Sequence, residues 1–129
     1  MPIFAALGIA QSGVAVYRKW LDAVSDNIAN MNNVSSTSQA AYQQKSIIAS
    51  AMGEGVQVGG VALGSAQGRL VYDPTHPLAD AGGYVRYPDI DLGDQMGQMI
   101  MAQRGYQANL SVVDRAKSAY EAALQIGRG

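Results

Sequence analysis

Apolar residues recur at alternating steps of three and four along the first 31 residues of the chain. This spacing is the heptad pattern of an amphipathic helix that packs against another helix. The segment NMNNVSSTSQAAY then interrupts it, because asparagine and a run of serines favour a helix end and a loop. The pattern predicts an N-terminal helix with its packing positions at Ile3, Leu7, Ala10, Val14, Tyr17, Leu21, Val24, Ile28 and Met31.

The hydrophobic period changes in the middle of the chain. The stretches YQQKSIIASA, GVQVGGVAL, GRLVYDP and GYVRYPDI are rich in valine, isoleucine and tyrosine, and glycine and proline separate them. Val56 and Val58, and then Val61 and Leu63, alternate with small or polar residues as in half-buried strands. We therefore expect a small, glycine-rich β region within residues 42–88.

The helical spacing returns at Asp91 and continues to the C-terminal end of the sequence. Three aspartates, Asp89, Asp91 and Asp94, stand at its start, where acidic side chains stabilise the first turn of a helix. The predicted packing positions are Leu92, Met96, Met99, Gln103, Tyr106, Leu110, Val113, Lys117, Tyr120 and Leu124.

Together these elements predict a mainly α fold with a small β region. The N- and C-terminal helices are expected to pair as a coiled coil around the glycine-rich β insert. We expect residues 1–33 and 90–129 to form the paired terminal helices, and residues 34–89 to form a loop and a small β domain.

Composition and motifs argue against several classes of function. The 129 residues carry a net charge of −1 with scattered basic residues, so we expect no nucleic-acid partner. The chain has no cysteine and a single histidine, His76, which lies in a proline turn and is best interpreted as a turn residue. The segment GEGVQVGG lacks the lysine of a phosphate loop and leads into a predicted strand. We expect no catalytic residue, cofactor, metal site or small-molecule substrate.

Carboxamides gather beside the first apolar seam, in LDAVSDNIANMNN (residues 21–33). Asn27 and Asn30 lie next to the packing positions, so we expect their side chains to be free in the monomer and available for hydrogen bonds. The alternative is that Asn30, Asn32 and Asn33 only end the helix. Two interpretations also remain open for Met96, Met99 and Met101, which form either an adaptable binding face or ordinary core.

Three segments resemble a known family. SDNIAN (residues 25–30) is similar to the S-x-N-[LI]-A-N signature of flagellar axial proteins, which form the rod, the hook and its associated structures. RLVYDPTHPLADAGGYVRYPDIDL (69–92) and YQANLSVVDRAKS (106–118) resemble, more narrowly, the proximal-rod proteins of the bacterial flagellar basal body. Asp26, Thr75 and the serine-rich stretch 34–41 depart from the family pattern.

The resemblance implies a structural subunit that assembles helically, with copies of itself and with other rod proteins, into the drive shaft that transmits motor torque. It also implies passage through the flagellar type III export apparatus without a cleaved signal peptide, and a place in the rod, in the periplasm or cell-wall space. The N-terminal MPIFAALGIAQSG has no basic region, in keeping with this route. The alternatives are another axial protein of the rod and hook family, or a soluble coiled-coil adaptor that forms a closed small oligomer.

Two sets of site residues follow from this interpretation. The expected subunit-interface residues are Ser25, Asn27, Ile28, Asn30, Tyr106, Gln107 and Asn109. The expected helix seam comprises Leu7, Val14, Tyr17, Leu21, Val24, Met31, Met96, Met99, Leu110, Val113 and Leu124.

Overall fold

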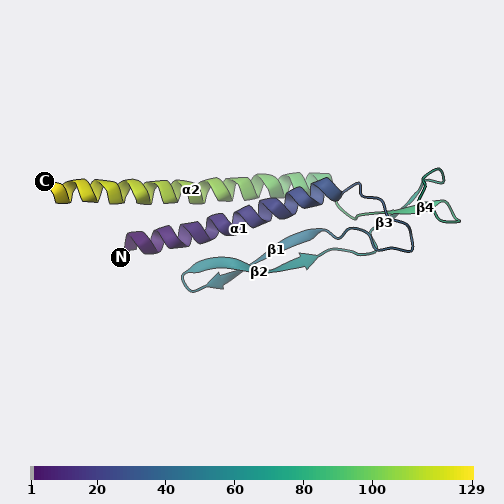
Figure 1. Ribbon diagram of the computed structural model, residues 1–129, viewed down its shortest axis with the longest axis horizontal. Helices are drawn as coiled ribbons and strands as arrows, with labels where there is room; N and C mark the ends of the chain where they lie inside the picture. Colours follow the sequence, from purple (N-terminus) through teal and green to yellow (C-terminus); the bar gives the residue numbers. More distant parts are fainter. Residues whose placement is uncertain (1) are drawn as a thin grey trace.

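Two long helices run antiparallel along the length of the molecule (Figure 1). The computed structural model describes residues 2–129, with helix α1 at Pro2–Asn30 and helix α2 at Leu92–Arg128. Asp91 caps α2, because its side-chain Oδ1 accepts a hydrogen bond from the backbone N–H of Asp94 at 2.8 Å. Both helices are formed where the heptad spacing predicts them, and the second begins beside the aspartates that mark its start in the sequence.

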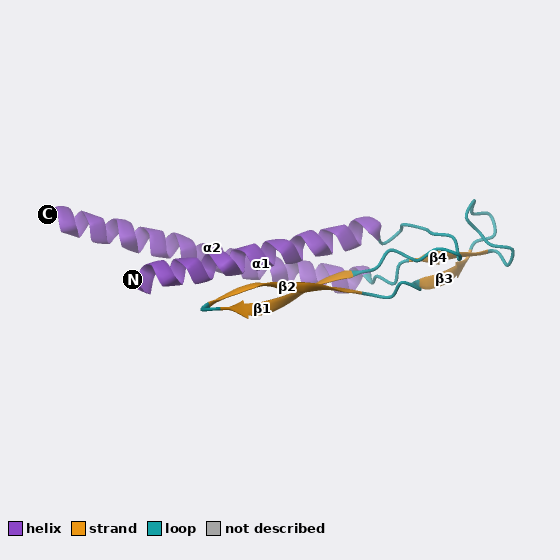
Figure 2. Ribbon diagram, turned by 60° about the horizontal axis from the view of Figure 1, so that its bottom comes forward, coloured by secondary structure: helices purple, strands orange, loops and turns teal. Residues whose placement is uncertain are grey.

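Two antiparallel hairpins connect the helices. Strand β1 (Lys45–Met52) pairs with β2 (Gly55–Leu63), and β3 (Arg69–Tyr72) pairs with β4 (Tyr84–Tyr87). The β1–β2 hairpin lies along α1, whereas β3–β4 lies at the end of the molecule opposite the two termini (Figures 1 and 2). The mainly α fold with a small β region is therefore confirmed.

The turn and the register of the β1–β2 hairpin explain its glycine content and its alternation. Gly53 adopts a φ of +56°, in the left-handed region that glycine enters without steric cost. Directly paired residues point to the same face, so the pairs Ile47–Val61 and Ala49–Val58 make one face apolar. Ile47, Ala49 and Val56 of the hairpin line a hollow against α1, whereas Val58 and Val61 remain 37% and 49% exposed.

The buried core is small and consists mainly of small side chains. Its apolar members are Ala10, Val16, Ala23, Val24, Ala41, Val85, Ile90 and Ala102. Helix α1 supplies half of them, because α2 covers one flank of this helix and the β1–β2 hairpin covers the neighbouring flank.

The predicted seam is displaced from the line along which the helices meet. Among its members only Val24 is fully buried, and Met96, Leu110 and Leu124 remain 47%, 37% and 48% exposed. These three side chains of α2 are therefore only partly covered within one chain, and their place in the helix seam stays a prediction. The remaining seam residues are half-buried: Leu7, Val14, Tyr17, Leu21, Met31, Met99 and Val113.

Candidate functional site

Asn27 connects three elements of the fold. Its Nδ2 donates hydrogen bonds to the backbone oxygen of Lys45 at 2.9 Å and to the side-chain Oε1 of Gln95 at 2.9 Å. Its Oδ1 accepts a bond from the backbone N–H of Lys45 at 2.8 Å. Asn27 and Gln95 are both completely buried. We call the two side chains, together with the Lys45 backbone, the amide junction.

The amide junction corrects the expectation for Asn27. Its side chain is not free in the single chain, because the start of β1 and the first turns of α2 converge on it and use both of its donors and its acceptor. A buried carboxamide needs such partners, since an unpaired one loses its hydrogen bonds to water without replacement. Asn30 bonds its own helix instead, through Nδ2 to the Asp26 backbone oxygen at 2.8 Å.

The two helices meet along a line of small and amide residues on α2. The ring of Tyr17 covers Gly105, and a Cβ at Gly13 would lie 2.9 Å from Cγ of Asn109. Trp20 Nε1 donates to Gln98 Oε1 at 3.3 Å. The α2 residues of this contact line are Gln95, Gln98, Ala102, Gly105 and Asn109.

The contact line is what the hydrophobic pattern missed. Its members follow heptad spacing as well as the apolar positions do, but glycine, alanine and amides do not register in a search for large apolar residues. Small residues at that spacing are the signal that would have revealed it, because they let two helix backbones approach closely.

The β1–β2 hairpin is attached to α1 at both of its ends. At the turn end, Ser12 Oγ accepts a bond from the backbone N–H of Val56 at 3.1 Å, and at the other end stands the amide junction. Between these attachments lies an apolar hollow of about 220 Å³, lined by Val16, Tyr17, Trp20, Ile47, Ala49 and Val56. The residues that line the hollow can pack against other apolar groups. They include no cluster of titratable side chains suited to acid–base chemistry.

The two charged groups with shifted pKa values, Lys45 and Asp80, lie at or near the surface. Lys45 Nζ approaches Asp26 Oδ2 at 3.1 Å, and this hydrogen bond raises the pKa of Lys45 above its usual range. Backbone N–H groups of Tyr84 and Gly82 donate to Asp80, and the Tyr84 bond is the main reason that the pKa of Asp80 is lowered. Across residues 2–129 no three histidine or acidic side chains come together as metal ligands.

The other expected interface residues lie at or near the surface of the single chain. Ser25 and Gln107 are exposed, whereas Ile28, Asn30 and Tyr106 are half-buried. Asn109 sits in the contact line, where its Nδ2 donates to the Gly105 backbone oxygen at 2.8 Å. A role for these residues between subunits stays a prediction.

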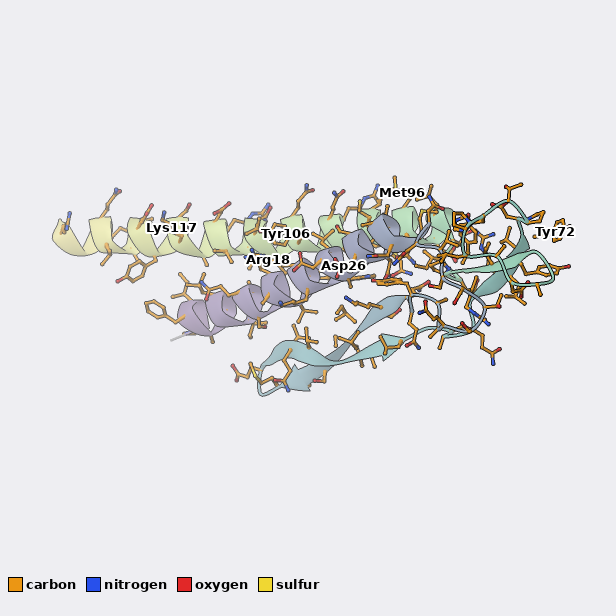
Figure 3. All side chains as sticks on the ribbon, turned by 45° about the vertical axis from the view of Figure 1, so that its right-hand side comes forward. Arg18, Asp26, Tyr72, Met96, Tyr106 and Lys117 are labelled. Carbon is orange, nitrogen blue, oxygen red and sulfur yellow. The ribbon has the colours of Figure 1, made fainter. Side chains whose placement is uncertain are left out.

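An apolar ridge on α2 is only about half covered by the rest of residues 2–129. Leu92, Met96 and Ile100 follow one another at steps of four, which places them on one side of the helix, and they are 46%, 47% and 49% exposed. Figure 3 shows Met96 on the side of α2 away from the β1–β2 hairpin. We call these three residues the α2 ridge. None of the helices described in residues 2–129 is long and apolar enough to cross a membrane.

Comparisons with known proteins identify the family of this chain. Residues 81–126 match the family model described as the C-terminal region of the flagellar basal body rod FlgEFG proteins. The flagellar basal-body rod protein FlgC of Salmonella typhimurium is 34% identical over 134 residues, covering 99% of this chain and 100% of the relative. FlgC of Borreliella burgdorferi is 30% identical over 152 residues, with 100% of both chains covered. FlgC of Bacillus subtilis is 31% identical over 150 residues, with 99% and 100% covered.

Paired terminal helices around a small β insert, with a flagellar rod sequence across the second helix, define a structural protein of the flagellar axis. The similarity extends over the whole length of the rod proteins compared. The chain belongs to the FlgC family of flagellar basal-body rod proteins, and its role is that of a structural rod subunit.

Proposed function

We propose that this subunit assembles helically, with copies of itself and with other rod proteins, into the shaft that transmits motor torque. The observation that carries the proposal is the α2 ridge, whose three large apolar side chains stand about half exposed in a row. Exposed apolar rows of this kind mark surfaces that another protein covers. Contacts between unlike surfaces of successive copies generate a helical assembly when the rotation does not close a ring.

The same geometry suggests that the helices and the β region have different roles in the subunit. We assign residues 1–33 and 90–129 to an inner, rod-forming domain, because they carry the paired helices and the α2 ridge. Residues 34–89 form the outer loop and β domain. Ser25, Ile28, Asn30, Tyr106 and Gln107 lie on the helices where neighbouring subunits can reach them.

The proposal includes no catalysis and no cofactor. The hollow against α1 is apolar, and His76 is engaged in its turn through Nδ1, which accepts a bond from the backbone N–H of Leu78 at 3.1 Å. We further propose export through the flagellar type III apparatus without a cleaved signal, followed by assembly in the periplasm or cell-wall space. The family likeness supports both steps.

The test replaces Met96 with glutamate in the bacterium that encodes the chain. A charge in the ridge must lose its water when a neighbour covers it, so Met96→Glu is expected to abolish rod assembly and swimming while secretion continues. Ser118→Glu is the matched control, because it adds the same charge at an exposed polar position of the same helix. Isolated basal bodies are probed for the subunit.

Two results would contradict the proposal. Normal rods with Met96→Glu would mean that no neighbour covers the ridge. A purified chain that sediments as a stable closed dimer, and is absent from basal bodies, would favour the coiled-coil adaptor instead.

A further inference from the structure

The β1–β2 hairpin has two outer edges, and α1 covers only one end of each. The backbone of Lys45 on β1 forms two hydrogen bonds with the side chain of Asn27, at 2.8 and 2.9 Å. Val56 on β2 donates its backbone N–H to Ser12 Oγ at 3.1 Å. Both residues therefore turn their backbone groups outward, away from the partner strand. Among the helices and strands described in residues 2–129, α1 is the only one outside the hairpin that contacts it.

The register identifies the other residues that face outward. In an antiparallel pair, directly opposite residues alternate between those that bond each other and those that turn their N–H and C=O groups outward. Within the described part of the chain, no hydrogen bond is formed by the outward groups of Val61 and Leu63, near the base of β2. The same holds for Ala49 and Ala51, near the turn of β1. The outward pairs are Lys45–Leu63, Ile47–Val61, Ala49–Val58 and Ala51–Val56.

Two stretches of edge, at diagonally opposite corners of the hairpin, are therefore open. We call residues 60–63 (GVAL) the open β2 edge and residues 49–52 (ASAM) the open β1 edge. Proteins usually protect such edges from pairing with charged residues, proline or a covering segment, and neither stretch contains a charge or a proline. Val61 and Leu63 are 49% and 60% exposed, so the open β2 edge also presents large apolar side chains.

We propose that the open β2 edge pairs with the open β1 edge of a second copy, so that the sheet continues from one subunit to the next. A strand added to an open edge satisfies the backbone groups of that edge, and this is a common mode of protein recognition. The partner is a second copy because the chain itself supplies the matching edge. Pairing two β2 edges would instead leave the outward groups of Ala49 and Ala51 unpaired, and it would close the assembly as a dimer.

The two edges fit in an antiparallel alignment that places Leu63 opposite Ala49, and Val61 opposite Ala51, of the next copy. All four residues face outward, so each opposite pair can exchange both of its N–H···O bonds. Directly opposite side chains project to the same face of a sheet. The large side chains of β2 therefore pack beside alanines, which leave room for them.

Helix α1 determines this alignment. It stands beside β2 near the turn, at Val56, and beside β1 at the base, at Lys45. A neighbouring hairpin at the same level would bring its own Lys45, with α1 attached, against Leu63. Placing Ala49 there instead moves the neighbour by four residues, about 13 Å at about 3.3 Å per residue, which clears both attachments. Each copy is displaced in the same direction from the last, so the contact joins unlike surfaces and continues from copy to copy.

A pair of engineered cysteines tests this alignment, because the chain has no cysteine of its own. The reporter combines Ala49→Cys with Leu63→Cys. Within one chain these positions are about 13 Å apart along the strands, too far to bridge. Between copies they are opposite, with Cα atoms about 5.5 Å apart, which suits a disulfide. Oxidation should give a ladder of dimers, trimers and longer products, whereas each single-cysteine variant should stay monomeric.

Proline at an outward position blocks the contact without removing a bond of the hairpin. Val61→Pro deletes an N–H that the single chain does not use, and proline is tolerated at such edge positions. Added to the reporter, it should abolish the ladder. Ala51→Pro, on the other edge, should do the same. Val61→Thr keeps the N–H and is the matched control, which should retain the ladder.

The inference rests on the proposed function, and the experiment separates the two. Where isolated basal bodies contain the subunit, absence of the ladder overturns the edge contact and leaves the rod function intact. Where they lack the subunit, the proposed function fails, and oxidation of the concentrated purified chain decides the edge contact by the same criterion. A ladder that survives both proline variants also overturns the proposal. Dimers formed with Leu63→Cys alone would overturn it too, because two β2 edges would then meet.

Discussion

Replacing Gly105 with alanine tests the close approach of the two helices. A Cβ at this position would lie 2.8 Å from Cδ1 of Tyr17 and closer still to Cε1 and Cζ, so the ring has to move. Moving the ring also disturbs its stacking on Trp20, whose ring centroid lies 5.9 Å away. Gly97 lies on the same helix, and a Cβ there would meet nothing within 4 Å. It provides the matched control.

Both substitutions gain helix propensity, but only Gly105→Ala also creates a steric overlap. Alanine in place of glycine in a helix stabilises it by about 1 kcal/mol, and this gain applies to both positions. Overpacking a close contact costs about 1 to 3 kcal/mol, and this cost applies only at Gly105. We therefore expect Gly97→Ala to be more stable than the parent by about 1 kcal/mol. Gly105→Ala should be less stable than Gly97→Ala by about 1 to 3 kcal/mol.

Thermal unfolding followed by circular dichroism at a helix-sensitive wavelength measures this difference. For a chain of this size, 1 kcal/mol corresponds to a shift of about 3 to 5 °C in the melting temperature. A further substitution, Tyr17→Leu, removes the ring and should bring Gly105→Ala close to the behaviour of Gly97→Ala, which a double-mutant cycle quantifies. Equal melting temperatures for the two alanine variants, with Tyr17 present, would refute the assigned helix contact.

Three further predictions concern the core, one turn and the chain ends. Val24→Asp buries a carboxylate at a site that is 1% exposed, so it should lower the free energy of unfolding, measured with denaturant, by about 3 to 5 kcal/mol. The control Ile126→Asp, at an 81% exposed site, should change this free energy by less than about 0.5 kcal/mol. The hydrogen bond from the Tyr84 N–H lowers the pKa of Asp80 in the folded chain. The carboxylate therefore stabilises its turn at pH values above the pKa of the unfolded chain, and this effect is lost as the pH falls through the lower pKa of the folded chain. Asp80→Asn should remove this acid dependence from the near-ultraviolet circular dichroism signal of the neighbouring tyrosines. Limited proteolysis of dilute protein should cut near the two ends first and within residues 42–88 last, and early cuts in the middle would contradict it.

Periodicity in the sequence was sufficient for the elements and their order. Steps of three and four persist through both helices because a helix that packs on one side must repeat its apolar positions with each turn. Alternation in the middle marks strands for the equivalent reason, and the pairs Ile47–Val61 and Ala49–Val58 show it in the hairpin register. The family segments were also legible, since each is a local run of residues.

The tertiary structure alone decided which flank of each helix is covered. Helix α1 has two partners, α2 and the β1–β2 hairpin, and heptad spacing does not divide a helix surface between them. Close contacts between the helices occur at Gly13 and Gly105, which carry no apolar side chain for a pattern search to find. The apolar residues that the pattern does find, such as Met96 and Leu110, stay half exposed in the single chain.

Asn27 shows the same division at a single residue. The sequence places a carboxamide beside an apolar seam, which is enough to expect a hydrogen-bonding role. Its partners, Lys45 and Gln95, are 18 and 68 residues away along the chain, so nothing local specifies them. They become partners because α1, β1 and α2 converge at one point. Since a buried amide without partners costs free energy, other arrangements of these three elements are disfavoured.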